Sequence, residues 1–389
     1  MQKKQLLLLF LIMFLMMLGF GIIIPILPFF VTKIGQADPF QLGLLSASYN
    51  IMQFLFSPIW GRLSDRVGRK PLILLALIGF AVTFAMFGLS DSYYEMLTWR
   101  ILGGIVSAAG IPTVTAMVAD IFPPNERAKG MGIIGAAVGM SFVFGPVIGG
   151  LLSKISLSYP FYASAFVALI TFVYAITALP ESLPPEKRLN NATERRGNPI
   201  SALTGSLGLM YNVLLVVSLA FAGMETTFAL YIFDQFGMNS EQLGYMFLVM
   251  GIIGAVVQAG MIGKLVKRYG EPAILAVGML FYTIGFIAVL TSDNFWSFAL
   301  TLSLFGAGQG MIRTTATAMI TQRTQLGQGV TSGNMSAMDS LGRIVGPIIG
   351  GALYGFHYTM PFWFGALLVG LMLALFLSRR SYLPKPTGM

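Results

Sequence analysis

Residues 61–70 read Gly61-Arg62-Leu63-Ser64-Asp65-Arg66-Val67-Gly68-Arg69-Lys70 and separate two long apolar stretches of the chain. A charge at the centre of a membrane helix costs roughly 2.5 to 3.5 kcal/mol even on the insertion scale that gives the smallest costs. We therefore expect this segment to be a loop at a membrane surface. It carries four cations and one acid, and short loops rich in Lys and Arg stay in the cytoplasm.

The composition indicates an integral membrane protein. The chain has 389 residues, of which 56% are hydrophobic and 10% are charged, whereas soluble domains carry about a quarter charged residues. The formal charge of +9 comes from short basic pieces between apolar runs, which favours contact with anionic lipid over nucleic acid. The chain has no Cys and one His, so we expect no disulfide, no metal site and no cofactor. It also lacks a phosphate-binding Gly-x-x-x-x-Gly-Lys-Ser/Thr loop, which argues against ATP as the energy source.

Twelve apolar runs are each long enough to cross a bilayer, which takes about 20 residues. The first run is too long for a signal peptide and lacks a small-residue cleavage site, so we keep it as a span. We therefore predict an all-α membrane protein with twelve transmembrane helices at roughly 5–31, 41–60, 71–90, 95–118, 130–152, 160–179, 209–233, 241–262, 273–291, 295–319, 331–354 and 360–378.

The distribution of basic residues orients these spans. With both termini inside, the pieces between spans on the cytoplasmic side hold nearly all Lys and Arg, and the external loops hold Lys33 and Lys154. We therefore expect a multi-pass protein of the cytoplasmic membrane with both termini in the cytoplasm.

The two halves of the chain resemble each other. Gly145-Pro146-Val-Ile-Gly149-Gly150 recurs as Gly346-Pro347-Ile-Ile-Gly350-Gly351. This predicts an N-terminal six-helix half at 1–180, a cytoplasmic linker at 181–208 and a C-terminal six-helix half at 209–389. Two similar halves suit a substrate path at their interface and alternating access.

The pattern Gly-x-Leu-x-Asp-Arg-x-Gly-Arg-Lys between the second and third spans resembles the signature loop of the major facilitator superfamily of transporters. The resemblance covers essentially the whole chain and is nearest to the twelve-span drug/proton antiporters of bacteria, including multidrug and tetracycline exporters. In the fifth span, a Gly-Pro pattern is similar to a motif associated with antiporters, and its residues here are Gly139, Gly145, Pro146, Gly149 and Gly150. The alternative is a helix-packing seam without a role in coupling.

Among the ionisable residues inside predicted spans, Arg100 and Glu225 are the first candidates for proton coupling. Arg100 in the fourth span cannot lose its proton and needs a carboxylate, carbonyl groups or a wet cavity. Its place resembles that of an arginine in drug/proton antiporters, so we expect a role in proton coupling, with a satisfied structural cation as the alternative. Glu225 in the seventh span is the best proton-site candidate and a candidate substrate contact. Its alternative is a hydrogen-bonded structural acid.

The tenth span departs from the pattern of those exporters. The arginine of the family pattern matches Arg313, but the second acid is replaced by an amide at Gln309. Asp339 and Arg343 are spaced i,i+4 in the eleventh span. Asp339 supplies the missing acid for proton coupling, or it is neutralised by Arg343, and we favour the second interpretation.

The resemblance also implies a conformational gate at the cytoplasmic surface. Asp65 would face the positive end of the eleventh span, and Arg66 or Arg69 would reach Asp120. The gate residues we expect are Gly61, Asp65, Arg66, Gly68, Arg69, Asp120 and Arg127.

Polar side chains within spans are candidates for contact with substrate: Asn50, Gln53, Gln258, Gln309 and Arg313, together with Glu225. The function we predict is proton-coupled efflux of amphiphilic, drug-like compounds by alternating access, without enzyme activity. The alternative is a proton-coupled exporter of a metabolite such as a sugar or amino acid. The partners would be a small-molecule substrate, protons and the lipid bilayer, and we expect a functional monomer.

Overall fold

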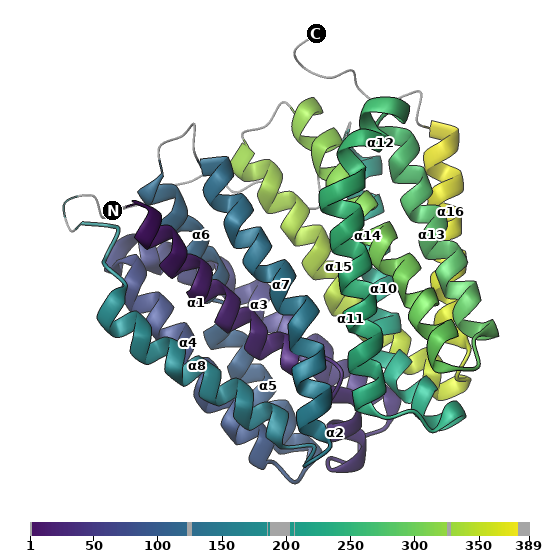
Figure 1. Cartoon of the computed structure of the whole chain (residues 1–389), viewed down its shortest axis with the longest axis horizontal. Helices are drawn as coiled ribbons and strands as arrows, with labels where there is room; N and C mark the ends of the chain where they lie inside the picture. Colours follow the sequence, from purple (N-terminus) through teal and green to yellow (C-terminus); the bar gives the residue numbers. More distant parts are fainter. Residues whose placement is uncertain are drawn as a thin grey trace. The chain divides into compact units, whose positions relative to one another are not determined.

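The computed structural model of the chain consists of helices in the part that it describes, residues 2–122, 127–184, 186, 203–205, 207–324 and 328–379. The helices that precede the longest break are α1 Gln2–Ile23, α2 Leu27–Lys33, α3 Pro39–Val67, α4 Arg69–Leu89, α5 Tyr93–Ser107, α6 Gly110–Ile121, α7 Arg127–Ser153 and α8 Tyr159–Ala178 (Figure 1). Those that follow it are α10 Gly208–Phe236, α11 Ser240–Val256, η2 Val257–Met261, α12 Ile262–Tyr269, α13 Glu271–Thr291, α14 Phe295–Arg323, α15 Gln328–Phe356 and α16 Met360–Arg379.

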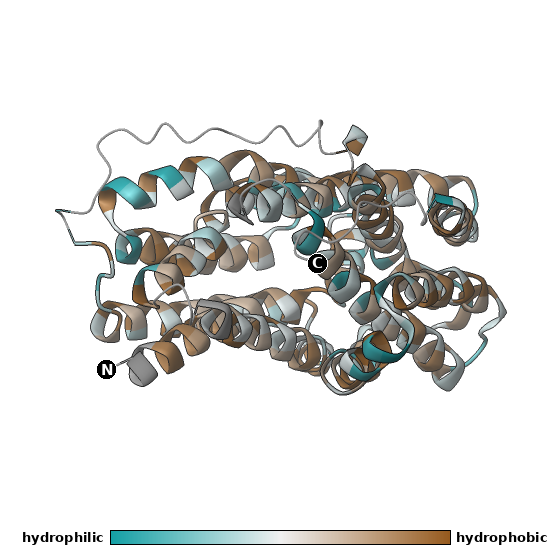
Figure 2. Cartoon of the chain, turned by 90° about the horizontal axis from the view of Figure 1, so that it is seen from above, coloured by the Kyte–Doolittle hydropathy of each residue, from teal (hydrophilic) through white to brown (hydrophobic). Residues whose placement is uncertain are grey.

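These helices form the twelve predicted spans. Within the described residues, ten helical segments are long and apolar enough to cross a membrane by composition alone. The remaining two spans are α3 and α15, of 29 residues each, which are long enough but carry charged residues and an internal proline. Figure 2 shows that hydrophobic colour dominates the helices and that hydrophilic colour is confined to short segments. The prediction of an all-α membrane protein is confirmed.

Three spans are interrupted for local reasons. The first breaks between α1 and α2, at Pro25, which has no backbone N–H to continue the helical hydrogen bonds. The fourth breaks between α5 and α6, and Pro112 again removes the donor that would bond back to Ala108. The eighth contains the five-residue π-helix η2, a rare conformation that is frequent at functional sites.

The structure divides into two compact units. Unit 1 contains Met1–Ala37, Ser48–Glu194 and Asn239–Leu248, and unit 2 contains Asp38–Ala47, Arg195–Met238 and Val249–Met389. The first turns of α3 therefore pack with unit 2, and the first turns of α11 pack with unit 1.

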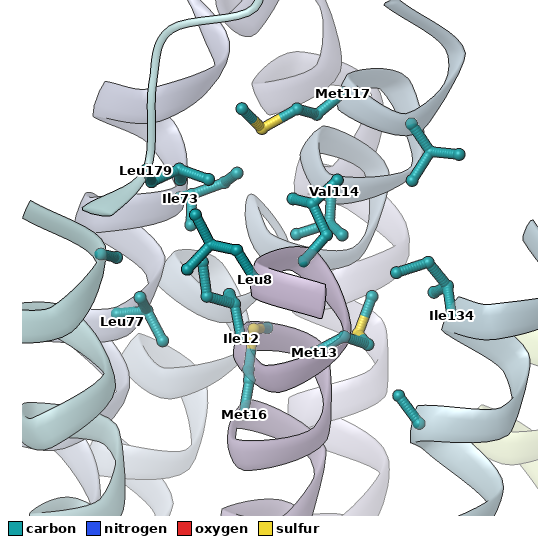
Figure 3. Close-up of a cluster of buried hydrophobic side chains, with 14 of the residues drawn as sticks. Leu8, Ile12, Met13, Met16, Ile73, Leu77, Val114, Met117, Ile134 and Leu179 are labelled. Atoms are coloured by element: carbon teal, nitrogen blue, oxygen red, sulfur yellow. The ribbon is translucent and has the colours of Figure 1, made fainter. Parts of the chain in front are cut away.

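Unit 1 has an apolar core around α1. Leu8, Ile12, Met13 and Met16 of this helix meet side chains from α4, α6 and α7, and Leu179, which follows α8 (Figure 3). Because lipid is as apolar as Leu, such a core adds little hydrophobic driving force between helices in a membrane. Close packing must therefore hold the helices together.

Glycines supply that close packing at equivalent places in the two halves. A Cβ at Gly149 of α7 would clash with the carbonyl of Ile22 of α1, and a Cβ at Gly350 of α15 would lie 2.6 Å from the carbonyl oxygen of Gly223 of α10. The repeated Gly-Pro motifs therefore form two similar seams, α1 against α7 in unit 1 and α10 against α15 in unit 2. This is the structural counterpart of the internal repeat.

Candidate functional site

The charged segment 61–70 is almost entirely helical, which corrects the expectation of a loop. Helix α3 continues through Val67 and α4 begins at Arg69, so the connection is Gly68 alone. Gly68 has a φ of 115°, a backbone conformation that favours glycine. A helix can continue past the apolar region because its charged side chains then lie outside hydrocarbon. A Cβ at Gly61 would meet no described atom within 4 Å, so packing does not require glycine there.

Arg69 is the centre of the expected gate. Its guanidinium is buried, pairs with Asp65 at 2.6 Å and with Asp120 at 3.0 Å, and donates a hydrogen bond to Ser64 Oγ. Of the two arginines proposed to reach Asp120, Arg69 makes the contact, and Arg66 is exposed. These contacts lie within unit 1. The side chain of Arg127 is outside the described part of the structure.

Glu181, which the sequence analysis did not single out, completes this cluster. Its carboxylate accepts hydrogen bonds from the backbone N–H groups of Arg69 and Lys70, at 2.9 and 3.1 Å, and so caps the N-terminus of α4. It also accepts from the N–H groups of Ser182 and Leu183. Partial burial raises the pKa of Glu181, but the four backbone hydrogen bonds outweigh it and hold the pKa below its ordinary value. One signal was present in the sequence: an acid directly after a span, at an end that was predicted to be cytoplasmic and therefore to carry basic residues.

Unit 2 carries a related ion pair with the charges exchanged. At the start of α13, Glu271 lies 3.6 Å from Arg323, at the end of α14, and accepts a hydrogen bond from Gln322 at 2.8 Å. In unit 1 the cation, Arg69, begins the helix and the acid, Asp120, lies on the other helix.

The glycines of the fifth span have different environments. A Cβ at Gly145 would lie 2.7 Å from the backbone of Gly21, and one at Gly150 would lie 3.0 Å from Ser240 and Glu241 of α11. At Gly139 a Cβ would meet no described atom within 4 Å. Pro146 lies inside α7, and its carbonyl faces Gly244 of α11.

The same end of α7 carries an ion pair to α11. Lys154 Nζ lies 2.8 Å from Glu241 Oε1, and the hydroxyls of Ser153 and Ser240 lie 2.7 Å apart. The hydrogen bond to Glu241 raises the pKa of Lys154, although that side chain is exposed. All four residues belong to unit 1.

Arg100 is a buried cation in an aromatic environment. Its side chain is 7% exposed, and its guanidinium carbon lies 4.7 Å from the ring centroid of Tyr49 and 5.8 Å from that of Phe87. Nε has no hydrogen-bond partner among the described residues. Gly104 permits this arrangement, since a Cβ there would lie 2.6 Å from the Tyr49 carbonyl oxygen.

The candidate amides of α3 lie near this site. Gln53 donates hydrogen bonds to Ser107 Oγ at 3.3 Å and to the hydroxyl of Tyr49 at 3.4 Å, so it links α3 to α5. Asn50 is half-buried on the same helix.

Glu225 is half-buried in α10, and the charge of Arg343 on α15 acts on it. The neighbouring hydroxyls of Thr226 and Thr227 donate to carbonyls of their own helix. The carboxylate is therefore the group in this turn that can exchange a proton.

Asp339 is engaged by two neighbours. Arg343 Nε lies 3.3 Å from Asp339 Oδ2, and Ser218 of α10 donates a hydrogen bond to Oδ1. This ion pair is the geometry expected if Arg343 neutralises the charge of Asp339. Arg343 thus interacts with both acids, Asp339 directly and Glu225 through its charge.

The remaining candidates lie on α14 and in η2, and the charge of Arg313 acts on Asp339. Gln309 is half-buried and Arg313 is exposed on α14, and Gln258 is exposed within η2. Tyr282 of α13 is fully buried, its hydroxyl has no partner among the described residues, and the charges of Glu225 and Arg343 act on it. Tyr282 could not be recognised from the sequence, because a tyrosine in an apolar span has no distinguishing pattern. The described residues contain no group of three potential metal ligands.

Comparison with known proteins places this geometry in a family. The chain is 28% identical over 376 residues, 96% of each chain, to the quinolone resistance protein NorA of Staphylococcus aureus strain MSSA476. It is 33% identical over 371 residues to multidrug resistance protein 2 of Bacillus subtilis strain 168, covering 93% of this chain and 92% of that protein.

Solved transporters share the fold. The human organic anion transporter MFSD10 (TETRAN) matches with a TM-score of 0.70 at 24% identity, covering 96% of this chain and 99% of that one. The nucleoside transporter NupG matches with a TM-score of 0.77 at 12% identity, covering 97% of this chain and 98% of that one. The model of the Major Facilitator Superfamily matches residues 9–271 and 213–388. The chain therefore belongs to the Major Facilitator Superfamily and is a multi-pass membrane transporter.

Proposed function

We propose that this transporter exports amphiphilic, drug-like compounds from the cytoplasm in exchange for protons. The observation that carries the proposal is the half-buried carboxylate of Glu225 in the middle of an apolar span, with Arg343 as its nearby cation. It occurs in a chain that is similar from end to end to a quinolone resistance protein and to a multidrug resistance protein.

Glu225 can couple proton entry to the export of a compound, because a carboxyl group cannot hold a proton and attract a cationic substrate at the same time. Apolar surroundings favour the neutral acid, and an approaching cation or the charge of Arg343 favours the carboxylate. A proton that enters through about 100 mV and one pH unit releases roughly 2.3 plus 1.4 kcal/mol. This suffices for a gradient of several hundredfold in a neutral compound at 1.4 kcal/mol per decade.

The other candidates have supporting roles in this proposal. Arg100 would contribute to coupling, and Asp339, neutralised by Arg343, would set the field at Glu225. Asn50, Gln53, Gln258, Gln309 and Arg313 would contact substrate. The Arg69 cluster would stabilise one state of the alternating-access cycle. We place the protein in a bacterial cytoplasmic membrane as a monomer with both termini in the cytoplasm, because its basic residues gather at that side.

The test uses inverted membrane vesicles with an acidic interior and a pH-sensitive dye. Vesicles that contain the wild type should release protons when a drug is added, and vesicles that contain Glu225→Gln should not. Glu186→Gln is the matched control, since Glu186 is an exposed acid outside the spans. Proton release on addition of sugars or amino acids, but not drugs, would replace this proposal by the metabolite exporter. A Glu225→Gln variant that still couples would exclude Glu225 as the proton carrier.

A further inference from the structure

Tyr282 of α13 carries a buried hydroxyl group that the protein leaves unused. The side chain is 0% exposed, and its oxygen has no hydrogen-bond partner among the described residues. A buried hydroxyl without a partner destabilises a protein, and phenylalanine would fill the same space without this cost. The hydroxyl therefore lowers the stability of this state and needs a role in another state of the protein to offset the loss.

The ring of Tyr282 is held in place by its neighbours. Phe305 of α14 meets it edge to face with ring centroids 5.1 Å apart, and the ring centroid of Phe221 of α10 lies 6.1 Å away. A Cβ at Gly308 of α14 would lie 2.8 Å from Cδ2 of the Tyr282 ring, so the absence of a side chain at Gly308 makes room for it. A fixed ring also fixes the position of the hydroxyl, which is buried too deeply in this state to contact a transported compound.

Glu225 lies one helical turn from this ring contact. It follows Phe221 by four residues, so the two side chains lie on one face of α10. The Glu225 carboxyl group is half-buried, and neither a hydrogen bond nor an ion pair joins it to a residue that the structure describes. A carboxyl acceptor and a hydroxyl donor, each without a partner in the described structure, therefore occur in the same part of unit 2.

The Tyr282 hydroxyl lies within the field of charged side chains from three helices. They are Glu225 of α10, Arg313 of α14, and Asp339 and Arg343 of α15. Of the two acids, Asp339 already accepts hydrogen bonds from Ser218 and Arg343. The two cations can only donate, whereas a tyrosine hydroxyl both donates and accepts. Glu225 is therefore the acid in this set that lacks a donor.

We propose that Tyr282 is a positioning residue for proton exchange at Glu225, and that its hydroxyl donates a hydrogen bond to the Glu225 carboxylate once the proton has left. When Glu225 releases its proton, the bonding electrons stay on the carboxylate, and the O–H bond of Tyr282 stays intact as it turns to the new negative charge. Tyr282 thus supplies no proton but sets the pH at which Glu225 releases one. The inference rests on the proposed function, in which Glu225 carries the proton.

The test follows the protonation of Glu225 by infrared spectroscopy, on the full-length protein in nanodiscs and without a drug. The carboxyl band that is present in the wild type and absent from Glu225→Gln reports the protonated group. In Tyr282→Phe, the pH at which half of this band is lost should lie about one pH unit higher than in the wild type, because the carboxylate has lost a hydrogen bond to its charge. The melting temperature should be unchanged or higher, since the variant keeps the ring and removes an unpaired hydroxyl.

Tyr231→Phe is the matched control. Tyr231 is a buried tyrosine on the same helix as Glu225, and within the described residues its hydroxyl is influenced by Tyr358 and not by Glu225 or Arg343. Loss of this hydroxyl should leave the infrared midpoint of Glu225 unchanged. A midpoint in Tyr282→Phe that equals the wild-type value, or lies below it, would overturn the proposal. A lower melting temperature with an unchanged midpoint would show that the Tyr282 hydroxyl has a structural role alone.

Proton release in inverted vesicles then connects this positioning role to transport. Tyr282→Phe should still release protons when a drug is added, with its pH profile shifted to higher pH by the same amount as the infrared midpoint. A shifted midpoint with an unshifted release profile would overturn the role of Tyr282 in transport. Failure of the proposed function is separate: wild-type vesicles would release no protons at any pH, while the infrared midpoint would still decide whether Tyr282 acts on Glu225.

Discussion

Nε of Arg69 lies 3.0 Å from Oδ2 of Asp120, and this ion pair ties the start of α4 to the end of α6. The Arg69 side chain is 8% exposed and that of Asp120 is 21% exposed, so the cation is shielded from solvent and the carboxylate only partly. Asp120 also accepts a hydrogen bond from Ser182 Oγ at 3.0 Å. The pair therefore connects three elements of unit 1 through one carboxylate.

Removal of the Asp120 charge should destabilise unit 1. Asp120→Asn leaves Arg69 with Asp65 as its remaining anion, so we expect a loss of about 1 to 3 kcal/mol, less than for a fully buried pair left with one partner. Thermal unfolding in detergent measures it. The matched control is Asp91→Asn, an exposed acid, which should leave the melting temperature unchanged. A loss no larger than that of the control would show that the pair adds nothing to stability.

The cap at Glu181 should make the stability of the folded protein depend on pH. Its pKa is lowered in the folded protein, so the carboxylate stabilises the fold fully above its unfolded pKa, and this contribution is lost as the pH falls through the lower folded pKa. Glu181→Gln should lower the stability near pH 7 by about 1 kcal/mol, the usual contribution of a helix cap.

Melting curves between pH 7 and pH 3 check this second prediction. The difference between wild type and Glu181→Gln should be largest near pH 7 and should shrink below about pH 4.3, the usual pKa of Glu. A difference that stays constant over that range would mean that the carboxylate charge has no part in the cap.

Asp339 and Arg343 of unit 2 should affect the stability of the protein as a coupled pair. Asp339→Asn leaves Arg343 without its direct partner, whereas the double change Asp339→Asn with Arg343→Gln removes both charges. If the pair is self-neutralised, the double variant should be more stable than Asp339→Asn alone, because no unpaired cation remains.

Proton release in vesicles then separates structure from coupling. The double variant should keep drug-driven proton release at a reduced rate, since Glu225 remains. Complete loss in both variants, with normal melting temperatures, would show that Asp339 itself carries protons.

Particular residues show how far the sequence predicts this structure. The seams of Gly149 and Gly350 could be predicted, because close helix packing in a membrane requires small residues and the motif recurs in the second half. The contact between Arg69 and Asp120 was also expected, since both lie at helix ends that the distribution of basic residues predicts to be on the same side of the membrane. Glu181 could be noticed as an acid directly after a span, but its role as a cap could not be predicted, because it binds backbone N–H groups that the sequence does not distinguish. The π-helix around Gln258 and the aromatic surroundings of Arg100 could not be predicted either, because they depend on how side chains pack.

The two glycines Gly139 and Gly149 should separate a packing role from a coupling role of the α7 motif. Gly149→Ala places a methyl group against the carbonyl of Ile22 and should cost about 1 to 3 kcal/mol. Gly139→Ala fills open space and should be neutral or stabilise the helix by up to about 1 kcal/mol. Melting temperature and proton release are measured on the same preparations. If the motif is only a seam, proton release should follow stability in both variants. Reduced proton release in Gly139→Ala at an unchanged melting temperature would show that the motif acts in coupling, because packing against α1 does not involve Gly139.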